Sequence, residues 1–413
     1  MSILYNLFIN CVSVLLKLIA PFHPKLKLSV NGHRQTSTIL KEKIKPQDRV
    51  IWFHCASLGE FEQGRPVIEK AKQLYPAHKI VISFFSPSGY EIRKNYELAD
   101  AVVYLPFDTN KKVQEFIELM HPEIAVFVKY EFWPNLLNQL NKKNIPTILI
   151  SGIFRKNQLF FKIYGSWMRN KLCLFSHFFV QDKNSKELLN SIGFDKVTLS
   201  GDTRFDRVFE IVNQNNTLDF LENFKDHKYT LVAGSTWPDD EKLLVDYINN
   251  QSTLDEKFII APHHINATAI QKLQKDILTK SVLFSNYQQN ELKNAQVFIV
   301  DTIGILTKVY SYADVAYVGG GFTNGIHNIL EPATFGVPIV IGPKHQKFKE
   351  AIDLLNLNGC LAVCNKNEFD KTFLELRNSK IRKEMGQKAS NYIKSNIGAT
   401  DLIIGYMINV IKN

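Results

Sequence analysis

Residues 315–344 read VAYVGGGFTNGIHNILEPATFGVPIVIGPK. The stretch begins as a buried strand, and Gly319, Gly320 and Gly321 follow that strand at once. Three glycines allow a sharp turn and bring backbone N–H groups close to a ligand. A helix is predicted over residues 329–335 and a second strand over residues 339–341. This order of strand, glycine loop, helix and strand indicates a parallel α/β domain.

The start of the predicted helix carries two polar side chains, Asn328 and Glu331. The free N–H groups and the positive dipole end of a helix suit a phosphate. A carboxylate one turn further on, such as Glu331, can accept two hydrogen bonds from a ribose diol. The alternative is a crossover connection whose glycines serve only packing. The His-Asn and Glu-Pro pairs around the helix favour a nucleotide site.

Length and charge restrict the class of protein. A chain of 413 residues is too long for one ordinary core, so two domains are expected. The content of 45% hydrophobic and 22% charged residues is typical of a soluble globular protein, and the net charge of +10 favours an anionic partner. The basic residues are scattered, without a finger motif or basic arm, so nucleic acid is not an expected partner. The five cysteines lack a convincing metal-ligand spacing, and Cys360 and Cys364 are expected to be buried thiols.

Apolar strands and helical segments alternate along the chain, which predicts parallel, doubly wound sheets. The alternation is lost over residues 201–214 and then restarts, so we expect an N-terminal domain at residues 28–205 and a C-terminal domain at residues 206–413. The last helix is a candidate for returning to the N-terminal domain. The predicted fold class is α/β, with two Rossmann-like doubly wound domains. The predicted strands cover residues 50–54, 79–84, 101–105, 124–128, 147–151, 178–180 and 197–199, then 229–234, 258–262, 282–284, 297–300, 315–318 and 339–341.

The N-terminal segment, residues 1–27, is the membrane-like part of the sequence. Residues 2–22 are mostly apolar but are interrupted by Asn6, Asn10 and Lys17. A spanning helix needs ~20 predominantly apolar residues, so the run is borderline. Neither a basic leader region nor a small-residue cleavage site marks a secretory signal. We expect a helix that lies in the membrane interface with its basic flank at anionic headgroups, and the alternative is a helix packed on its own domain.

Polar side chains follow the predicted strands, at the edge where parallel sheets bind ligands. Glu60 comes after the strand at residues 50–54, near a helix start and in a mostly uncharged neighbourhood, which suits a general base. The alternative is a solvated first-turn Glu that favours the helix dipole. Glu131 precedes an aromatic-Pro turn, where a carboxylate can cap a helix or bind a sugar. Ser235, Thr236 and His264 follow strands of the second domain in the same way.

Short motifs occur in a definite order along the chain. They are His54–Glu60 for H-A-x-S-x-G-E, Ser86–Gly89 for T-P-T-G, Glu131–Asn135 for E-x-W-P-N, Gly201–Asp206 for G-N-x-K-F-D, Ala233–Thr236 for A-G-S-T, Ala261–His264 for a P-R-H segment and Gly319–Pro332 for G-G-S…G-G-H-N-x-L-E-P. The order of these motifs resembles that of the 3-deoxy-D-manno-octulosonic acid (Kdo) transferases, and the resemblance covers residues 4–392. The chain departs from the family pattern at several positions, among them Gly321 in place of Ser, Ile326 in place of Gly and His263 in place of Arg.

The resemblance implies the GT-B architecture and an inverting, metal-independent transfer of Kdo from CMP-Kdo to the lipid A precursor, lipid IVA, in lipopolysaccharide biosynthesis. It implies no cofactor, and a place at the cytoplasmic face of the cell inner membrane, as a peripheral protein or with a single N-terminal anchor. The N-terminal domain is then the acceptor domain and the C-terminal domain the donor domain. The implied residues are Glu60 as catalytic base; Ser57, Gly59, Ser88 and Glu131 at the acceptor or transition state; and Arg204, Ser235, Thr236, His264, Gly320, Gly321, Asn328 and Glu331 at the donor.

Two other functions stay open at this point. A GT-B transferase or epimerase that uses a UDP-sugar would have a similar glycine loop and ribose-binding Glu, and competition by CMP against UDP separates it from a Kdo transferase. The other is a non-catalytic lipid-binding protein with a decayed transferase fold. The presence of Glu60 and Glu331 argues against that second function.

Overall fold

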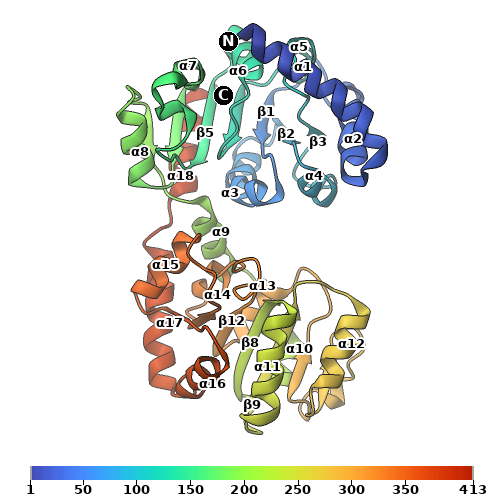
Figure 1. Cartoon of the computed structure of the whole chain (residues 1–413), viewed down its shortest axis with the longest axis vertical. Coiled ribbons are helices and arrows are strands. Elements are labelled where there is room, and N and C mark those ends of the chain that lie inside the picture. The colour runs from blue at the N-terminus through green and yellow to red at the C-terminus, as the bar shows by residue number, and fades with distance from the viewer. Residues whose placement is uncertain (1, 412–413) are drawn as a thin grey trace. The chain divides into compact units, whose positions relative to one another are not determined.

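Two parallel sheets, each in its own compact unit, make up the fold. The computed structural model describes residues 2–411, so Met1 and residues 412–413 of the predicted domains lie outside the described part. The chain divides into a first unit, Met1–Arg207 with Asn396–Asn413, and a second unit, Val208–Ser395. Each contains one seven-stranded sheet with helices against it (Figure 1). The predicted α/β class with two doubly wound domains is confirmed.

The strands of the first unit are β1 (Val50–His54), β2 (Lys79–Phe84), β3 (Ala101–Tyr104), β4 (Ile124–Val128), β5 (Thr147–Gly152), β6 (His177–Val180) and β7 (Val197–Leu199). They pair in the order β3-β2-β1-β4-β5-β6-β7, all parallel. The order reverses between β1 and β4, which is the switch point of the sheet. Interior strands are buried on both faces, so Trp52 packs in one apolar cluster and Phe53 in the other.

Side-chain caps mark the starts of α3, α4 and α8 in the first unit. A capping box starts α3, and the side chains of Ser86 and Asp182 accept N–H groups at the starts of α4 and α8. The helices are α1 (Ser2–Ile19), α2 (Pro24–Lys43), α3 (Leu58–Leu74), α4 (Pro87–Arg93), α5 (Asn110–Met120), α6 (Pro134–Lys142), α7 (Ser166–Leu172), α8 (Lys183–Asn190) and α18 (Ala399–Val410), with α9 (Thr203–Val212) leading into the second unit.

The C-terminal helix α18 belongs to the first unit, where Figure 1 draws it in red among the blue and green elements. Ile403, Ile404 and Met407 are buried in the same apolar cluster as Ile51 and Phe53 of β1. Asp206 accepts hydrogen bonds from the Thr400 N–H at 2.7 Å and from the Thr400 hydroxyl at 2.8 Å. The last described residues of the chain therefore complete the core that its early strands begin.

The strands of the second unit are β8 (Tyr229–Thr236), β9 (Glu256–Pro262), β10 (Ser281–Leu283), β11 (Val297–Ile299), β12 (Val315–Val318), β13 (Ile339–Ile341) and β14 (Cys360–Ala362). They pair in the order β10-β11-β9-β8-β12-β13-β14, all parallel, with the switch point between β8 and β12. Its helices are α10 (Asp219–Lys225), α11 (Pro238–Asn250), α12 (Ala267–Asp276), α13 (Leu306–Val309), α14 (Leu330–Thr334), α15 (Lys349–Asn356), α16 (Lys366–Glu375) and α17 (Ser379–Lys394).

Three local predictions in the second unit need correction. The helix predicted over residues 329–335 is α14, which has only five residues. Strand β14 was not predicted, although its neighbour β13, which has the same length, was. Cys360 is buried in β14 as expected, but Cys364 is exposed because the strand ends at Ala362.

Helix α1 is apolar but lies largely at the surface. Ile9 and Ser13 are its buried residues, and the segment Ser2–Phe22 is long and apolar enough to cross a membrane by length and composition. Core helices of soluble proteins and signal sequences share this length and composition, so one such helix is weak evidence for a span. The exposed large apolar side chains of α1 are Ile3, Leu4, Leu7, Phe8, Val14, Leu15, Leu18 and Ile19, which we call the exposed face of α1.

Candidate active site

The candidate residues of each unit gather at the carboxyl ends of its strands, around the switch point. Glu60 follows β1 and Glu131 follows β4, and these two strands are paired. In the second unit Ser235 lies at the end of β8 and Gly320 follows β12, and those strands are paired as well. Ligands of open parallel sheets bind in the crevice beyond the strands at this point. Glu60, Glu131, Ser235 and Gly320 therefore lie at the edge where parallel sheets of this kind bind ligands.

Glu60 lies in the first turn of α3 and is partly buried. Its Oε2 accepts the Ser57 N–H at 3.0 Å, and the two residues form the capping box of the helix. Burial raises the pKa of the Glu60 carboxyl, and the charge of Glu131 raises it further, while His54, the Ser57 N–H and Lys129 oppose the rise. The carboxylate thus stabilises the helix start and also has the raised basicity that suits a general base.

Glu131 is buried at the end of a chain of hydrogen bonds that starts in the core. Its Oε2 lies 3.0 Å from Nε2 of His54 and accepts the indole N–H of Trp133 at 2.6 Å. On the other side of the imidazole, Nδ1 lies 2.8 Å from the Ser83 hydroxyl oxygen, which accepts the indole N–H of Trp52 at 2.8 Å. The orientation of the Glu131 carboxylate is therefore set by buried groups rather than by solvent.

Gly59 and Ser88 lie in the two helix starts next to these carboxylates. A Cβ built on Gly59 would meet nothing within 4 Å, so this side of α3 faces open space. The Ser88 hydroxyl lies 2.8 Å from that of Ser86, which caps α4. A Cβ on Gly89 would lie 3.0 Å from the Leu58 nitrogen, so the glycine lets the start of α4 pack against the start of α3. The two predicted acceptor turns are thereby held together.

Arg204, predicted as a donor contact, lies in the first unit at the start of α9. Its Nε donates to Oδ2 of Asp202 at 2.9 Å, and its backbone N–H donates to Oδ1 of the same carboxylate at 2.9 Å. The Gln63 amide of α3 also donates to Asp202, at 3.3 Å. The guanidinium therefore already has a carboxylate partner and is attached to the helix that carries Glu60.

The glycine loop after β12 is packed against its own unit. The Gly320 N–H donates at 2.8 Å to Asp240, which is fully buried and also accepts the Tyr317 hydroxyl at 2.5 Å. Gly320 has a φ of +93°, which only glycine adopts readily, and a Cβ on Gly321 would lie 2.6 Å from Cα of Gly342. The packing role that the sequence left open thus applies to both glycines, and the Gly320 N–H already has an acceptor.

Ser235 and Thr236 stand at an irregular end of β8. Ser235 has a φ of +55°, in the left-handed region that non-glycine residues avoid, and the β8–β9 register shifts between Gly234 and Thr236. The Thr236 hydroxyl donates to Oε1 of Glu241 at 3.0 Å. Backbone in such strained conformations concentrates at functional sites, so the geometry here is compatible with ligand contact.

A stack of aromatic rings covers this end of the second sheet. The Trp237 ring is stacked on His263 at 5.0 Å between centroids, and His263 is stacked on His327 at 4.3 Å. His264, the predicted donor contact, is exposed and meets Trp237 edge-on at 5.0 Å. The indole N–H of Trp237 donates to Nε2 of His327 at 2.9 Å. Burial lowers the pKa of His327 to about 4, with help from the charges of His263 and His264, so this imidazole is a neutral acceptor at pH 7.

Glu331 and Asn328 are joined as a pair at the start of α14. The Asn328 amide donates to Oε1 of Glu331 at 2.9 Å, and the Thr307 hydroxyl donates to Oε2 at 2.8 Å. The Asn328 side-chain oxygen accepts the Leu330 N–H at 3.1 Å, which begins the helix. A carboxylate oxygen can accept more than one hydrogen bond, so Glu331 keeps capacity for a diol while its orientation is held.

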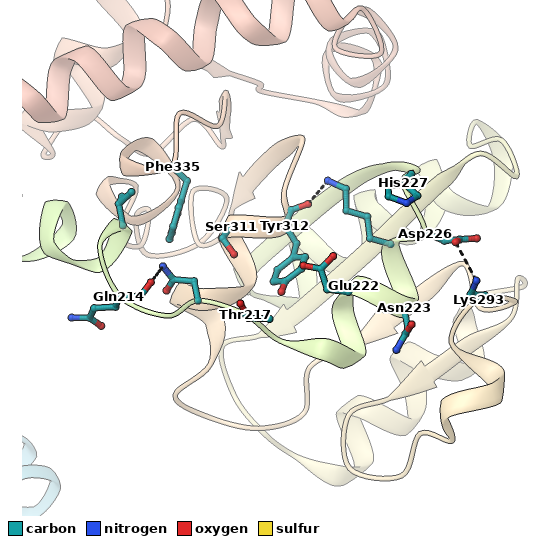
Figure 2. A pocket seen from close by; sticks show the side chains of 13 residues that line it. Gln214, Thr217, Glu222, Asn223, Asp226, His227, Lys293, Ser311, Tyr312 and Phe335 are labelled. Atoms are coloured by element: carbon teal, nitrogen blue, oxygen red, sulfur yellow. Dashed lines mark hydrogen bonds and ion pairs between the residues drawn. The ribbon is translucent and has the colours of Figure 1, made fainter.

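Two cavities of the second unit lie at opposite edges of the sheet. A cavity of about 360 Å³ at the carboxyl edge is lined by Thr236, Trp237 and His264, with others. A larger cavity of about 750 Å³ includes Asp226, whose carboxylate pairs with Lys293 at 3.5 Å (Figure 2). Its lining residues precede β8, β11 and β12, so it lies at the amino edge, away from the predicted site.

Within residues 2–411 no group of three or more His, Cys, Asp or Glu side chains could hold a metal ion.

Sequence reasoning missed three residues that organise these sites: His54, Trp237 and Asp240. The sequence pattern could have indicated His54 and Trp237. His54 ends β1 and Trp237 directly follows β8, and each lies near a predicted site residue. Asp240 had no such signal beyond its place in the first turn of α11, since its bonds reach residues 77 and 80 positions away.

The chain has relatives among known proteins. The model of the family "3-Deoxy-D-manno-octulosonic-acid transferase (kdotransferase)" matches residues 32–207. The 3-deoxy-D-manno-octulosonic acid transferase of Aquifex aeolicus is 27% identical over 84% of this chain and 92% of its own. A bifunctional glycosyltransferase/methyltransferase of Fusobacterium nucleatum is 29% identical over 91% of this chain, which spans 59% of that relative's length.

The fold has solved relatives as well. The structure of UDP-GlcNAc 2-epimerase from Neisseria meningitidis covers 88% of this chain and 100% of its own at a TM-score of 0.59 and 14% identity. At that identity the likeness shows the fold alone, and the predicted GT-B architecture is confirmed. With the family match and the long alignments, this chain is therefore related to the 3-deoxy-D-manno-octulosonic acid transferase family, whose model its residues 32–207 match.

Proposed function

We propose that this protein transfers Kdo from CMP-Kdo to the lipid A precursor, lipid IVA, with inversion at the anomeric carbon. The observation that carries the proposal is the Glu60 carboxyl, partly buried at the switch point of the first sheet with a raised pKa. A base that removes a proton from a sugar hydroxyl needs that environment. The family match over residues 32–207 supplies the substrate class.

In the proposed reaction Glu60 accepts the proton of an acceptor hydroxyl as that oxygen bonds to the anomeric carbon of Kdo. The bond from that carbon to the CMP phosphate oxygen breaks, and its electron pair leaves with the phosphate. Glu131, held by His54 and Trp133, is placed to accept a hydrogen bond from the acceptor sugar. Ser57, Gly59 and Ser88 form the rest of the acceptor edge.

CMP binds to the second unit in this proposal. Glu331 takes the ribose diol, while Ser235, Thr236, His264 and Asn328 line the same edge. Because α14 has only five residues, its dipole gives the phosphate little support, and hydrogen bonds from side chains carry more of the binding. The packed Gly320 and Gly321 shape the loop. Arg204 is the proposed cation for the phosphate or the Kdo carboxylate; contact requires it to share its donors with Asp202.

The proposed location of the protein is the cytoplasmic face of the cell inner membrane. The exposed face of α1 and the net charge of +10 both favour an anionic lipid surface. Tyr164 and the fully exposed Ile163 add apolar surface near α1, because Trp167 of the same segment contacts Tyr5 in a tilted arrangement, with 5.6 Å between the ring centroids. A peripheral attachment brings the protein to an acceptor that is itself a lipid.

The test is to incubate the purified protein with CMP-Kdo and tetraacylated lipid A precursor and to weigh the product. A mass increase of one or more Kdo units supports the proposal. The second candidate, a transferase or epimerase that uses a UDP-sugar, has support in the fold likeness alone. Calorimetric binding of UDP in preference to CMP, with no Kdo product, would favour that candidate.

A further inference from the structure

Helix α1 is attached to the carboxyl edge of the first sheet by side-chain hydrogen bonds. The Tyr5 hydroxyl donates to Oδ2 of Asp108 at 2.7 Å, and the Asn135 amide donates to the side-chain oxygen of Asn6 at 2.7 Å. Asp108 follows β3 and Asn135 lies in the first turn of α6, after β4. The same edge carries the proposed acceptor residues. Figure 1 shows α1 passing beside α6 at this edge.

Asp108 and Asn135, which the α1 side chains contact, are buried and bonded to each other. Asp108 and Asn135 are 1% and 5% exposed. Asp108 accepts the backbone N–H groups of Asn135 at 2.9 Å and Leu136 at 2.8 Å, and its carbonyl accepts the Asn135 amide at 2.6 Å. The Asp108 carboxylate thereby caps the start of α6. Any displacement of Tyr5 and Asn6 therefore acts on the first turn of α6.

That turn leads directly back to Glu131. Residues 131–135 comprise the end of the β4–α6 connection and the first residues of α6, and within them Trp133 donates its indole N–H to Glu131 at 2.6 Å. The turn is thus held at one end by His54 and at the other by Asp108. The contacts of α1 reach the proposed acceptor carboxylate through only these few buried bonds.

The residues that make these contacts are distinct from the exposed face of α1. Tyr5, Asn6, Ile9 and Ser13 point inward or are partly buried, whereas Leu4, Leu7 and Phe8 are more than 60% exposed. A helix that served only to hold the protein at a lipid surface would have no need of two polar contacts with the acceptor edge. The inward face therefore calls for a role of its own.

We propose that α1 is a positioning element of the acceptor site: its Tyr5–Asp108 and Asn6–Asn135 hydrogen bonds hold the 131–135 turn, and with it Glu131, in the orientation that receives the acceptor sugar. The inference rests on the proposed function for its substrate. Tyr5 and Asn6 are positioning residues, since they act on the substrate through Asp108, Asn135 and Glu131. The helix thus links the lipid surface to the sugar site within one element.

The test compares a Tyr5→Phe/Asn6→Ala double variant with an Asn10→Ala control. Both variants keep the exposed face of α1, and Asn10 is exposed, with its amide bonded only within the helix to the Asn6 carbonyl. Transfer is measured with the acceptor dispersed in detergent, so that membrane binding does not limit the rate. The double variant should lose roughly tenfold in kcat/KM through a higher KM for the acceptor, with CMP affinity and vesicle sedimentation unchanged. The control should match the wild type.

Hydrogen–deuterium exchange provides a readout that needs no activity. The Asn135 and Leu136 amides should exchange faster in the double variant than in the control, because the Asp108 carboxylate that accepts them loses a partner. If wild-type protein makes no Kdo product but exchange rises, the proposed function fails and the positioning contact stands. If the folded double variant keeps the wild-type acceptor KM and exchange pattern, the inference is overturned.

Discussion

The Nε2 atom of His54 lies 3.0 Å from Oε2 of Glu131, inside the first unit and beneath the proposed acceptor site. A carboxylate oxygen can only accept, so the imidazole carries its hydrogen on Nε2 in either charge state. Both bonds that the described side chains give Glu131, from His54 and Trp133, fall on this oxygen. Oε1 is then the oxygen left to meet a substrate hydroxyl.

Replacement of the proposed base should remove most of the activity. Glu60→Gln keeps the size of the side chain and an oxygen for the Ser57 N–H, but it cannot take up the proton. We expect kcat to fall ~10²–10⁴-fold, the usual contribution of a general base, with CMP affinity unchanged. Glu97→Gln, at an exposed position of the same unit, is the control. Near-normal turnover in folded Glu60→Gln protein would show that Glu60 only caps the helix and is not the base.

Replacement of Glu131 and replacement of His54, two neighbours of Glu60, should shift the acidic limb of the pH profile in opposite directions. The pKa of Glu60 is raised by burial and then by the charge of Glu131, and it is lowered by His54. Activity requires the ionised base, so the acidic limb of kcat/KM follows this pKa. Glu131→Gln should move the limb to lower pH, and His54→Gln should move it to higher pH, whatever the loss in absolute rate. Two shifts of the same sign would contradict this electrostatic arrangement.

Donor affinity should depend on Glu331. Glu331→Ala should weaken CMP binding by roughly 1.5–3 kcal/mol, the range for hydrogen bonds to a charged group, and Glu331→Gln should lose less. Calorimetry on folded protein measures both. Glu222→Ala is the matched control, because Glu222 is exposed and lines the cavity at the opposite edge of the second sheet. Equal CMP affinity in all three variants would mean that Glu331 serves only to hold the start of α14.

Membrane recovery should depend on the exposed face of α1. Replacement of Leu4, Leu7 and Leu18 by Ser should lower partitioning to anionic vesicles at least tenfold, since a fully buried Leu contributes about 1.5–3 kcal/mol. Leu254 and Leu278 in the second unit are at least as exposed, and their replacement by Ser is the control.

Deletion of residues 1–22 should lower membrane recovery without abolishing nucleotide binding, and high salt should release the truncated protein more readily than the full chain. Equal partitioning of both chains at every salt concentration would place the membrane contact elsewhere.

Sequence patterns predicted the fold well where strands are long and buried on both faces. The limits of β1, β2 and β4 were predicted to the residue, because apolar runs such as residues 50–54 end at polar turn residues. The glycine loop was located correctly, but its main task was ambiguous. Only the structure shows that Gly320 is bonded to Asp240, since no periodicity links residues 80 positions apart.

The same limit applies to α1 and to the acceptor edge. The apolar composition of α1 predicted a helix in the membrane interface, whereas the bond from Tyr5 to Asp108 spans 103 positions and leaves no mark in a local pattern. The pairing of His54 with Glu131 spans 77 positions and was missed for the same reason. Residues such as Glu60, next to a strand end and a helix start, are visible in sequence because their context is local.

The inclusion of α18 in the first unit has a consequence for biosynthesis. A ribosome that has released residues 1–395 has delivered the whole second unit, but Ile403, Ile404 and Met407 of the first unit's core are still to come. Domains usually fold in the order in which they are made. Here the unit that is begun first is the last that can close its core. A nascent chain that ends before residue 396 therefore leaves the N-terminal sheet, and not the C-terminal one, exposed to chaperones and proteases.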